Sequence, residues 1–239
     1  MRLDKFLSET TDLTRSQASK ALKQGVVEVN GEVVKSGAIH IEVGTDQITI
    51  NGIELVGQTG PRYFMLHKPA GYVCANEDGE HPIVFDLMID EPNVQKLHTV
   101  GRLDLDTTGI LLITDDGKWS HTITSPKHHK DKTYRAWLAE PLVEKAEAKL
   151  EKGIMLEEEK NRTKPAVLQR INDQEVLLTI SEGRYHQVKR MFAALGNRVV
   201  QLHRESIGGI MLDENLAEGE YRPLTDEEIA ILGATKGQQ

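Results

Sequence analysis

Two aspartates, Asp104 and Asp106, occupy the loop sequence GRLDLDTTG, which leads directly into the apolar run ILLIT at residues 110–114. A short apolar run of this kind predicts a buried strand, so the loop presents both carboxylates at one end of that strand. An ionised aspartate is a nucleophile, whereas aspartates in loops also commonly cap turns. Asp115 and Asp116 follow the run, but the four residues lack the regular spacing of a calcium loop. We therefore weigh a nucleophile against a turn cap and expect no metal site.

Two later segments supply side chains that would act together with Asp104. Tyr134 lies in the predicted strand KTYRAW, and Lys189 lies in SEGRYHQVKRMFAALG, where a turn leads into a helix. A cation beside a carboxylate favours the charged form of the carboxylate, which is the nucleophilic form. Either side chain alone is ordinary, since half-buried tyrosines and surface lysines are common. An acid, an aromatic ring and a cation together favour the nucleophile interpretation of Asp104.

Positive charge is concentrated in one stretch of the chain. The net charge of -8 by itself argues against a nucleic-acid partner. Residues 183–204, however, contain no acidic residue, and their basic side chains are Arg184, Lys189, Arg190, Arg198 and Arg204, with His186 and His203 among them. This stretch is a candidate phosphate-binding surface, although a run of charge is also typical of any solvated face.

The N-terminal residues predict two short amphipathic helices, at 3–9 and 14–24. Thr14 and Gln17 have the spacing of a capping box, and Gly25 is a natural stop for the second helix. That helix leaves a basic face formed by Arg15, Lys20 and Lys23. Such a face fits an RNA backbone, although three cations on one helix are also common in proteins that bind no nucleic acid.

Strands follow these helices. Asn-Gly pairs at 30–31 and 51–52 lie between short β-prone runs, and Asn-Gly favours the positive φ angles of a tight hairpin turn. A Gly- and Pro-containing segment then separates this module from the rest of the chain. We expect a first domain at 1–57, a linker at 58–61, a second domain at 62–232 and a flexible tail at 233–239.

The second domain is predicted to be an α+β fold. Apolar and β-prone runs predict strands at 62–67, 110–114, 133–137, 176–180 and 199–202. Helices are predicted at 143–152, 186–195 and 226–232, and the last begins with a capping box formed by Thr225 and Glu228.

Composition indicates an ordinary globular protein. Hydrophobic residues make up 38% of the chain, and no run approaches the ~20 apolar residues of a membrane-spanning helix. The N-terminus lacks the apolar stretch and cleavage site of a signal peptide, so we expect a cytoplasmic protein with no membrane partner. Cys74 is the single cysteine, which excludes an internal disulfide and a zinc ribbon. His128 and His129 lack a third ligand at useful spacing, so we expect no metal there either.

Several of these segments resemble known RNA-binding and RNA-modifying proteins. The first 55 or so residues resemble the S4-type RNA-binding domain through RLDKF, TRSQA and GVVEVNG. The segments GRLDLDTTGILLITDDG, KTYRAW and SEGRYHQVKRMFAALG are similar to motifs of the RsuA/RluB/RluE/RluF family of pseudouridine synthases. The resemblance covers nearly the whole chain. It implies a small S4-like α/β domain followed by a catalytic domain with a mixed, mainly antiparallel sheet.

The resemblance also implies roles for individual residues. Asp104 is the expected nucleophile, Tyr134 stacks on the target uracil, Lys189 pairs with Asp104, and Arg102 enters the RNA as the base leaves. Position 189 holds lysine where related families often carry arginine, which keeps the charge but loses the bidentate geometry of a guanidinium. The basic residues expected to hold RNA are Arg15, Lys20, Lys23, Lys132, Arg184, His186 and Arg190.

Three further runs, GPRYFMLHKPAGYVC, DGKWSHTITSPKHH and LHRESIGGIMLDENLAEGEYRPLTDEE, are similar to the branch of the family that modifies 16S ribosomal RNA. The implied protein is an isomerase without cofactor or metal, acting as a monomer on 16S RNA or a small-subunit ribonucleoprotein particle, with uridine 516 as the expected target. Two other functions stay open: a non-catalytic RNA-binding factor of ribosome assembly, and a glycoside hydrolase that uses two carboxylates.

Overall fold

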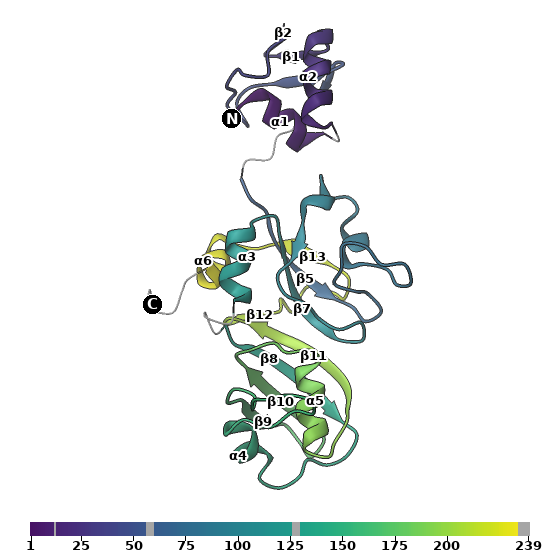
Figure 1. Cartoon of the computed structure of the whole chain (residues 1–239), viewed down its shortest axis with the longest axis vertical. Coiled ribbons are helices and arrows are strands. Elements are labelled where there is room, and N and C mark those ends of the chain that lie inside the picture. Colours follow the sequence, from purple (N-terminus) through teal and green to yellow (C-terminus); the bar gives the residue numbers. More distant parts are fainter. Residues whose placement is uncertain (12, 56–59, 126–129, 234–239) are drawn as a thin grey trace. The chain divides into compact units, whose positions relative to one another are not determined.

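The computed structural model describes residues 1–11, 13–55, 60–125 and 130–233 (Figure 1). Contacts divide the chain into two compact units, Met1–Pro61 with Asp90–Lys96, and Arg62–Ile89 with Leu97–Gln239. The sequence had assigned Asp90–Lys96 to the second domain. Most of the predicted tail lies outside the described residues, but Gly233 is the last residue of a helix and does not belong to a tail. The domain limits read from the sequence stay a prediction.

The first unit packs two helices, α1 (Leu3–Thr10) and α2 (Arg15–Gln24), against a small sheet. The Thr14 hydroxyl accepts the Gln17 backbone N–H, and the Gln17 side chain accepts the Thr14 backbone N–H, which confirms the predicted capping box. Gly25 ends α2 in the left-handed conformation, as predicted. The apolar faces of both helices and one face of the sheet form a single core, which includes Leu3, Phe6, Leu22, Val27 and Ile48.

Both predicted hairpins are present in the first unit. The strands β1 (Val27–Val29), β2 (Glu32–Val33), β3 (Ile48–Ile50) and β4 (Ile53–Glu54) form an antiparallel sheet in the order β2-β1-β3-β4. The turns fall at the two Asn-Gly pairs, and Asn30, Gly31, Asn51 and Gly52 all have positive φ. Local turn chemistry therefore determines where each hairpin reverses.

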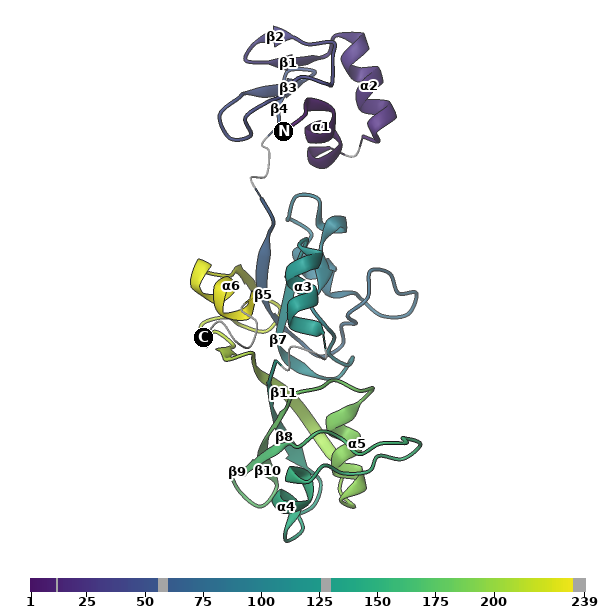
Figure 2. The same ribbon diagram turned by 60° about the vertical axis from the view of Figure 1, so that its left-hand side comes forward.

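A nine-stranded sheet forms the centre of the second unit (Figures 1 and 2). Its main path is β13-β5-β7-β11-β8-β10-β9, with β12 paired to β11 and β6 paired to β7. The strands are β5 (Tyr63–Lys68), β6 (His98–Thr99), β7 (Thr108–Thr114), β8 (Lys132–Leu138), β9 (Val167–Arg170), β10 (Glu175–Ile180), β11 (Val199–Ile207), β12 (Ile210–Met211) and β13 (Tyr221–Pro223). Only β7 and β11 run parallel among these described strands, which confirms a mixed, mainly antiparallel sheet.

Helices pack on this sheet at separate places. α3 (Gly117–Thr124) and α6 (Asp226–Gly233) pack together, α4 (Ala146–Glu151) contacts β9, and α5 (Gln187–Ala194) contacts β11 (Figure 2). Two short 3-10 helices, η1 (Val84–Met88) and η2 (Val94–Lys96), complete the described elements. The core beneath α3 and α6 joins both helices to the sheet, and its members include Met65, Ile110, Trp119, Ile207 and Leu232.

Some elements differ from the sequence prediction. α3 was not predicted; the Asp116 carboxylate caps it by accepting the backbone N–H groups of Lys118 and Trp119. β11 continues to Ile207, beyond the predicted 199–202, because its bulges let a polar segment stay paired with β8. The short strands β6, β9, β12 and β13 were also missed, since two to four residues carry too little alternation to be recognised.

The parallel contact between β7 and β11 depends on a glycine. Gly109 pairs with Arg204 across the two strands and has φ +113. A Cβ at this position would lie 2.2 Å from the Arg204 carbonyl oxygen and 2.6 Å from the Arg204 nitrogen. Both the backbone angle and the space therefore require glycine.

Gly109→Ala should lower the free energy of unfolding by about 3 kcal/mol or more, because it adds a backbone clash to an unfavourable φ. Urea denaturation of the purified protein measures the change. Gly117→Ala is the matched control, since Gly117 begins α3 with open space around its Cα and should tolerate alanine. Equal stability of the two variants would contradict this account of the strand contact.

Candidate active site

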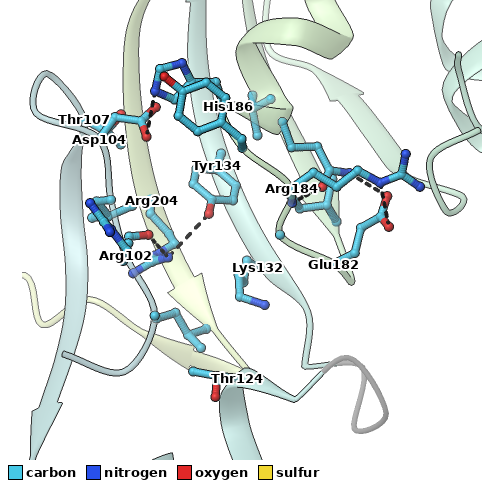
Figure 3. A pocket seen from close by; sticks show the side chains of 18 of the residues that line it. Arg102, Asp104, Thr107, Thr124, Lys132, Tyr134, Glu182, Arg184, His186 and Arg204 are labelled. Carbon is cyan, nitrogen blue, oxygen red and sulfur yellow. Dashed lines mark hydrogen bonds and ion pairs between the residues drawn. The ribbon is translucent and has the colours of Figure 1, made fainter. Parts of the chain in front are cut away.

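A cavity of about 810 Å³ opens in the second unit (Figure 3). Its walls come from segments far apart in the sequence: the loop before β7, the start of β8, the turn before α5, and the middle of β11. Asp104, Tyr134 and Lys189 all line it, as do Arg102 and Lys132. The structure thus brings together the acid, the aromatic ring and the cation that the sequence singled out.

A buried lysine donates hydrogen bonds to the backbone of the loop that carries Asp104. Lys68 is fully buried at the end of β5, and its ammonium group donates to the backbone oxygens of Thr107 at 2.8 Å and Leu105 at 3.3 Å. Burial lowers the pKa of Lys68, although the nearby carboxylates of Asp106 and Asp104 act in the opposite direction. Lys68 therefore fixes the loop backbone on both sides of Asp106.

Lys189 bridges the two carboxylates of this loop. Its Nζ lies 3.2 Å from Oδ2 of Asp104 and 2.6 Å from Oδ1 of Asp106. Burial disfavours the charged form of the Asp106 carboxyl, but the hydrogen bond and charge of Lys189 outweigh it, so the pKa of Asp106 lies below its ordinary value. Burial also disfavours the charged form of Lys189 and would lower its pKa. The hydrogen bonds and charges of Asp106 and Asp104 outweigh this effect, so the pKa of the ammonium group is raised. Lys189 is therefore cationic across the neutral range.

His186 reaches the same carboxylate from another direction. Its Nε2 lies 3.5 Å from Oδ1 of Asp104, as the dashed line in Figure 3 marks. The sequence placed His186 only in the RNA-binding set, so its position beside the expected nucleophile was missed. His186 has φ +46 at the N-cap of α5, a left-handed conformation that is costly for a residue other than glycine.

Tyr134 lies deeper in the cavity, beside a buried arginine. Tyr134 is 8% exposed and Arg204 is 2% exposed, and the two residues are cross-strand partners on β8 and β11. The Arg204 guanidinium donates from Nε to the Ile110 oxygen at 2.9 Å and from Nη1 to the Tyr134 hydroxyl at 3.4 Å. Nη1 also lies 3.5 Å from the backbone oxygen of Arg102, so one side chain connects β7, β8 and the loop.

Besides His186, sequence reasoning also undervalued Arg204 and Lys68. Arg204 entered only as one charge in a basic stretch, and the Lys-Pro-Ala-Gly segment at 68–71 was interpreted only as a turn. A cation in a predicted strand indicates a site residue when its side chain faces inward, because the charge must then find acceptors inside the fold. Recognising that position required the strand register, which the sequence alone did not provide.

Lys132 stands at the start of β8, facing the same cavity. Burial, together with the nearby charge of Arg204, lowers the pKa of Lys132 to about 8. Its Nζ donates to the backbone oxygen of Lys130 at 3.0 Å. The charge of Asp131 acts in the opposite direction but does not outweigh the desolvation of this ammonium group.

Arg184 and Arg190, both expected to hold RNA, are bonded within the protein. Arg184 pairs with Glu182 at 3.3 Å and with Glu159 at 3.5 Å, and also donates to two backbone oxygens. Arg190 pairs with Glu159 at 3.1 Å and donates to the backbone oxygen of Glu157 at 2.6 Å. The count of charge along residues 183–204 began one residue after Glu182, and it could not reveal Glu159, which lies far away in the chain. An RNA contact by either arginine stays a prediction, and it would compete with these bonds.

The remaining predicted residues are placed as follows. Arg102 is exposed on the cavity wall, whereas Arg15, Lys20 and Lys23 are exposed on α2 of the first unit. His128 and His129 lie outside the described residues. Within the described part of the chain, no cluster of three or more His, Cys, Asp or Glu side chains could hold a metal ion. No described helix is long and apolar enough to cross a membrane.

Comparison with known proteins extends over both units. Residues 62–194 match the RNA pseudouridylate synthase family, and residues 1–48 match the S4 domain. The ribosomal small subunit pseudouridine synthase A of Haemophilus influenzae is 57% identical over 232 residues, which covers 97% of this chain and 99% of the relative. The protein of the same name from Escherichia coli K12 is 54% identical over 230 residues, covering 96% and 99%. A crystal structure of a pseudouridylate synthase is 56% identical, with a TM-score of 0.70 and coverage of 97% and 99%.

Lys132→Met should raise the free energy of unfolding by about 1 kcal/mol at pH 7, because it removes a partly buried ammonium group and keeps the aliphatic packing. The pKa of Lys132 is about 8 in the folded protein against 10.5 ordinarily. Between these values the unfolded chain binds more protons than the folded protein, so the stability of the unmodified protein rises with pH. The advantage of the variant should therefore shrink toward pH 10.

Urea denaturation at pH 7 and at pH 9.5 measures both effects. Lys152→Met is the matched control, since Lys152 is an exposed lysine at the end of α4. A Lys132→Met variant that is less stable than the unmodified protein at pH 7 would refute the assignment of a costly, partly desolvated charge.

Proposed function

This chain belongs to the RNA pseudouridylate synthase family, and from that premise we propose that it isomerises one uridine of small-subunit ribosomal RNA, with Asp104 as the nucleophile. It is a pseudouridine synthase, an isomerase with an N-terminal S4 domain. The observation that carries the proposal is the ion pair of Asp104 with Lys189 inside the cavity that also holds Tyr134. An ionised carboxylate beside a fixed cation has the form that nucleophilic attack requires.

The reaction rearranges bonds without a redox change. The N1–C1′ bond of uridine breaks, the uracil turns, and a C5–C1′ bond forms; the proton on C5 is lost and N1 gains one. Asp104 is able to contribute by adding to the ribose C1′, by assisting formation of a glycal, or by adding to C6 of the base. Each route keeps the detached uracil in the cavity, where proximity is worth ~7–11 kcal/mol. The proposed chemistry needs no cofactor.

Tyr134 is suited to hold the uracil while it turns. The ring lines the cavity wall, and its hydroxyl is fixed by Arg204 at 3.4 Å. A fixed aromatic face stabilises a flipped base by stacking, as is common for bases taken out of a helix. We assign Tyr134 this stacking role and a part in moving the C5 proton.

Arg102 is suited to act on the RNA outside the cavity. It is exposed, two residues before Asp104, and its backbone oxygen faces Arg204. An exposed cationic side chain at this place would occupy the space that the flipped uridine leaves in the RNA. Lys132 lies further inside, where its ammonium group would face a phosphate or a carbonyl oxygen of the bound nucleotide.

The proposed substrate is 16S ribosomal RNA, free or in a small-subunit particle, with uridine 516 as the target. Two relatives whose names specify the small ribosomal subunit share 54–57% of their residues with this chain over almost its full length. The exposed cations of α2, Arg15, Lys20 and Lys23, would supply binding through the S4 domain. We expect a monomer located in the cytoplasm.

The alternative of a non-catalytic assembly factor is tested by a direct assay. Purified protein is incubated without metal or cofactor with 16S RNA and with small-subunit particles, and pseudouridine is mapped by carbodiimide labelling and reverse transcription. One new stop in 16S RNA is the expected result. Tight binding without any stop would favour the assembly factor, and release of free uracil would indicate a hydrolase.

Asp104→Asn should abolish product formation, by a factor of about 10³ or more in kcat, and keep RNA binding within a few-fold. The amide cannot act as the nucleophile, while its size preserves the loop. Single-turnover formation of pseudouridine and a filter-binding assay measure the two properties. Asp106→Asn is the matched comparison: it shares the contact with Lys189 but is 70% exposed, so it should lose about tenfold at most. Retained product formation in Asp104→Asn would overturn the proposed role.

Lys189→Met should lower kcat by about 10²-fold, because Asp104 and Asp106 would lose their shared cation. Lys189→Arg restores the charge with a different hydrogen-bond geometry and should recover most of the lost rate. Comparison of kcat among the three proteins at saturating RNA tests this point. Equal impairment of the Met and Arg variants would mean that packing, and not charge, is what Lys189 provides.

A further inference from the structure

Tyr185 is an exposed aromatic side chain at the cavity. It is 76% exposed, and among the Phe, Trp and Tyr residues of the described chain it is the one that solvent reaches freely. Its ring stacks on the imidazole of His186, with centroids 3.8 Å apart and an interplanar angle of 21°. His186 in turn contacts Asp104 at 3.5 Å, and both rings line the cavity. A pair of stacked rings therefore extends outward from Asp104.

The backbone beneath these rings is held firmly. The Gln187 side chain accepts the Arg184 backbone N–H at 2.8 Å and donates to Glu182 at 2.7 Å, which closes the turn before α5. Arg190 donates to the Tyr185 backbone oxygen at 3.2 Å while it pairs with Glu159. The internal bonds of Arg184 and Arg190 thus build the support for residues 185–186. His186 keeps its left-handed backbone, φ +46, within this support.

The outer face of Tyr185 is too exposed to hold the reacting uracil. Tyr134, which is buried beside Arg204, already offers a face within the cavity. When one uridine of an RNA flips into the cavity, the neighbouring bases lose their stacking contact with it. An exposed aromatic ring at the rim of the cavity would replace that contact for one of them. His186 covers the opposite face of the Tyr185 ring and thereby sets its plane.

We propose that Tyr185, backed by His186, is a stacking platform for an RNA base adjacent to the target uridine. The ligand class is a nucleobase of single-stranded or locally opened RNA, which is recognised by its π-face and not by its charge. This inference rests on the proposed RNA substrate. It adds a specificity-determining contact to the RNA that is separate from the proposed catalytic residues Asp104, Tyr134 and Lys189.

Tyr185→Ala should weaken binding of a short RNA that contains the target uridine by about tenfold and raise KM by a similar factor. The loss should fall on KM and not on kcat, because the ring does not touch the reacting atoms. The slope of log K against log salt concentration should not change, since no charge is removed. Tyr185→Leu, which keeps apolar bulk without a π-face, should resemble Tyr185→Ala, and Tyr185→Phe should restore most of the affinity.

A fluorescent base gives a readout that does not depend on catalysis. RNAs carrying 2-aminopurine at each position flanking the target uridine are titrated with each protein. With the unmodified protein and Tyr185→Phe, emission from one flanking position should be quenched by stacking; with Tyr185→Ala it should stay high. Val167→Ala is the matched control, because Val167 is 70% exposed and does not line the cavity.

The two proposals fail separately. If the unmodified protein makes no pseudouridine but quenches the probe through Tyr185, the proposed reaction is wrong and the platform stands. If pseudouridine forms but Tyr185→Ala leaves affinity and emission unchanged, the platform is wrong. A loss that Tyr185→Phe does not restore would also overturn it, since the hydroxyl and not the ring face would then be responsible.

Discussion

The parallel contact between β7 and β11 is the constraint on which the second unit depends. It comprises two residue pairs, His203 with Thr108 and Arg204 with Gly109, yet it joins β13-β5-β7 to β11-β8-β10-β9. So short a pairing offers few backbone hydrogen bonds, and the Arg204 side chain adds bonds across the same junction. The close approach of the two backbones is possible because position 109 has no Cβ.

The candidate site follows from this junction. Asp104 precedes β7, Tyr134 lies on β8, and β11 stands between those two strands, so the register at Gly109 sets how far the carboxylate lies from the ring. α5 then returns against β11 and brings Lys189 to the carboxylates. A slip of one residue in β11 would turn Arg204 away from its partners. Catalytic geometry and fold specificity therefore depend on the same contacts.

Local chemistry was predictable from the sequence, and long-range pairing was not. The capping box at Thr14 and the Asn-Gly turns depend on neighbouring residues, so they could be recognised without the fold. The loop proposed to carry the nucleophile was singled out because an acidic motif precedes an apolar run. Arg184 and Arg190 were assigned to RNA because their partner, Glu159, lies more than twenty residues away in the chain. The stacked pair of Tyr185 and His186 needs a left-handed backbone at position 186, and a histidine does not predict this conformation.

The distribution of charge in the cavity explains why an acidic protein is able to act on RNA. The carboxylates of Asp104 and Asp106 are matched by Lys189. Lys132 and Arg204 lie on the cavity wall, and among the described residues their hydrogen bonds go to backbone oxygens and the Tyr134 hydroxyl. Among the described residues, Nη2 of Arg204 is buried and has no hydrogen-bond partner. Burying such a donor lowers the stability of the fold, so stability alone does not explain its presence. Cations held in this way are poised for an electron-rich ligand, whose carbonyl or phosphate oxygens would satisfy donors that the folded chain leaves partly unused. Binding of RNA would thus offset part of the desolvation cost of these cations, which links the charge of the cavity wall to affinity for the nucleotide.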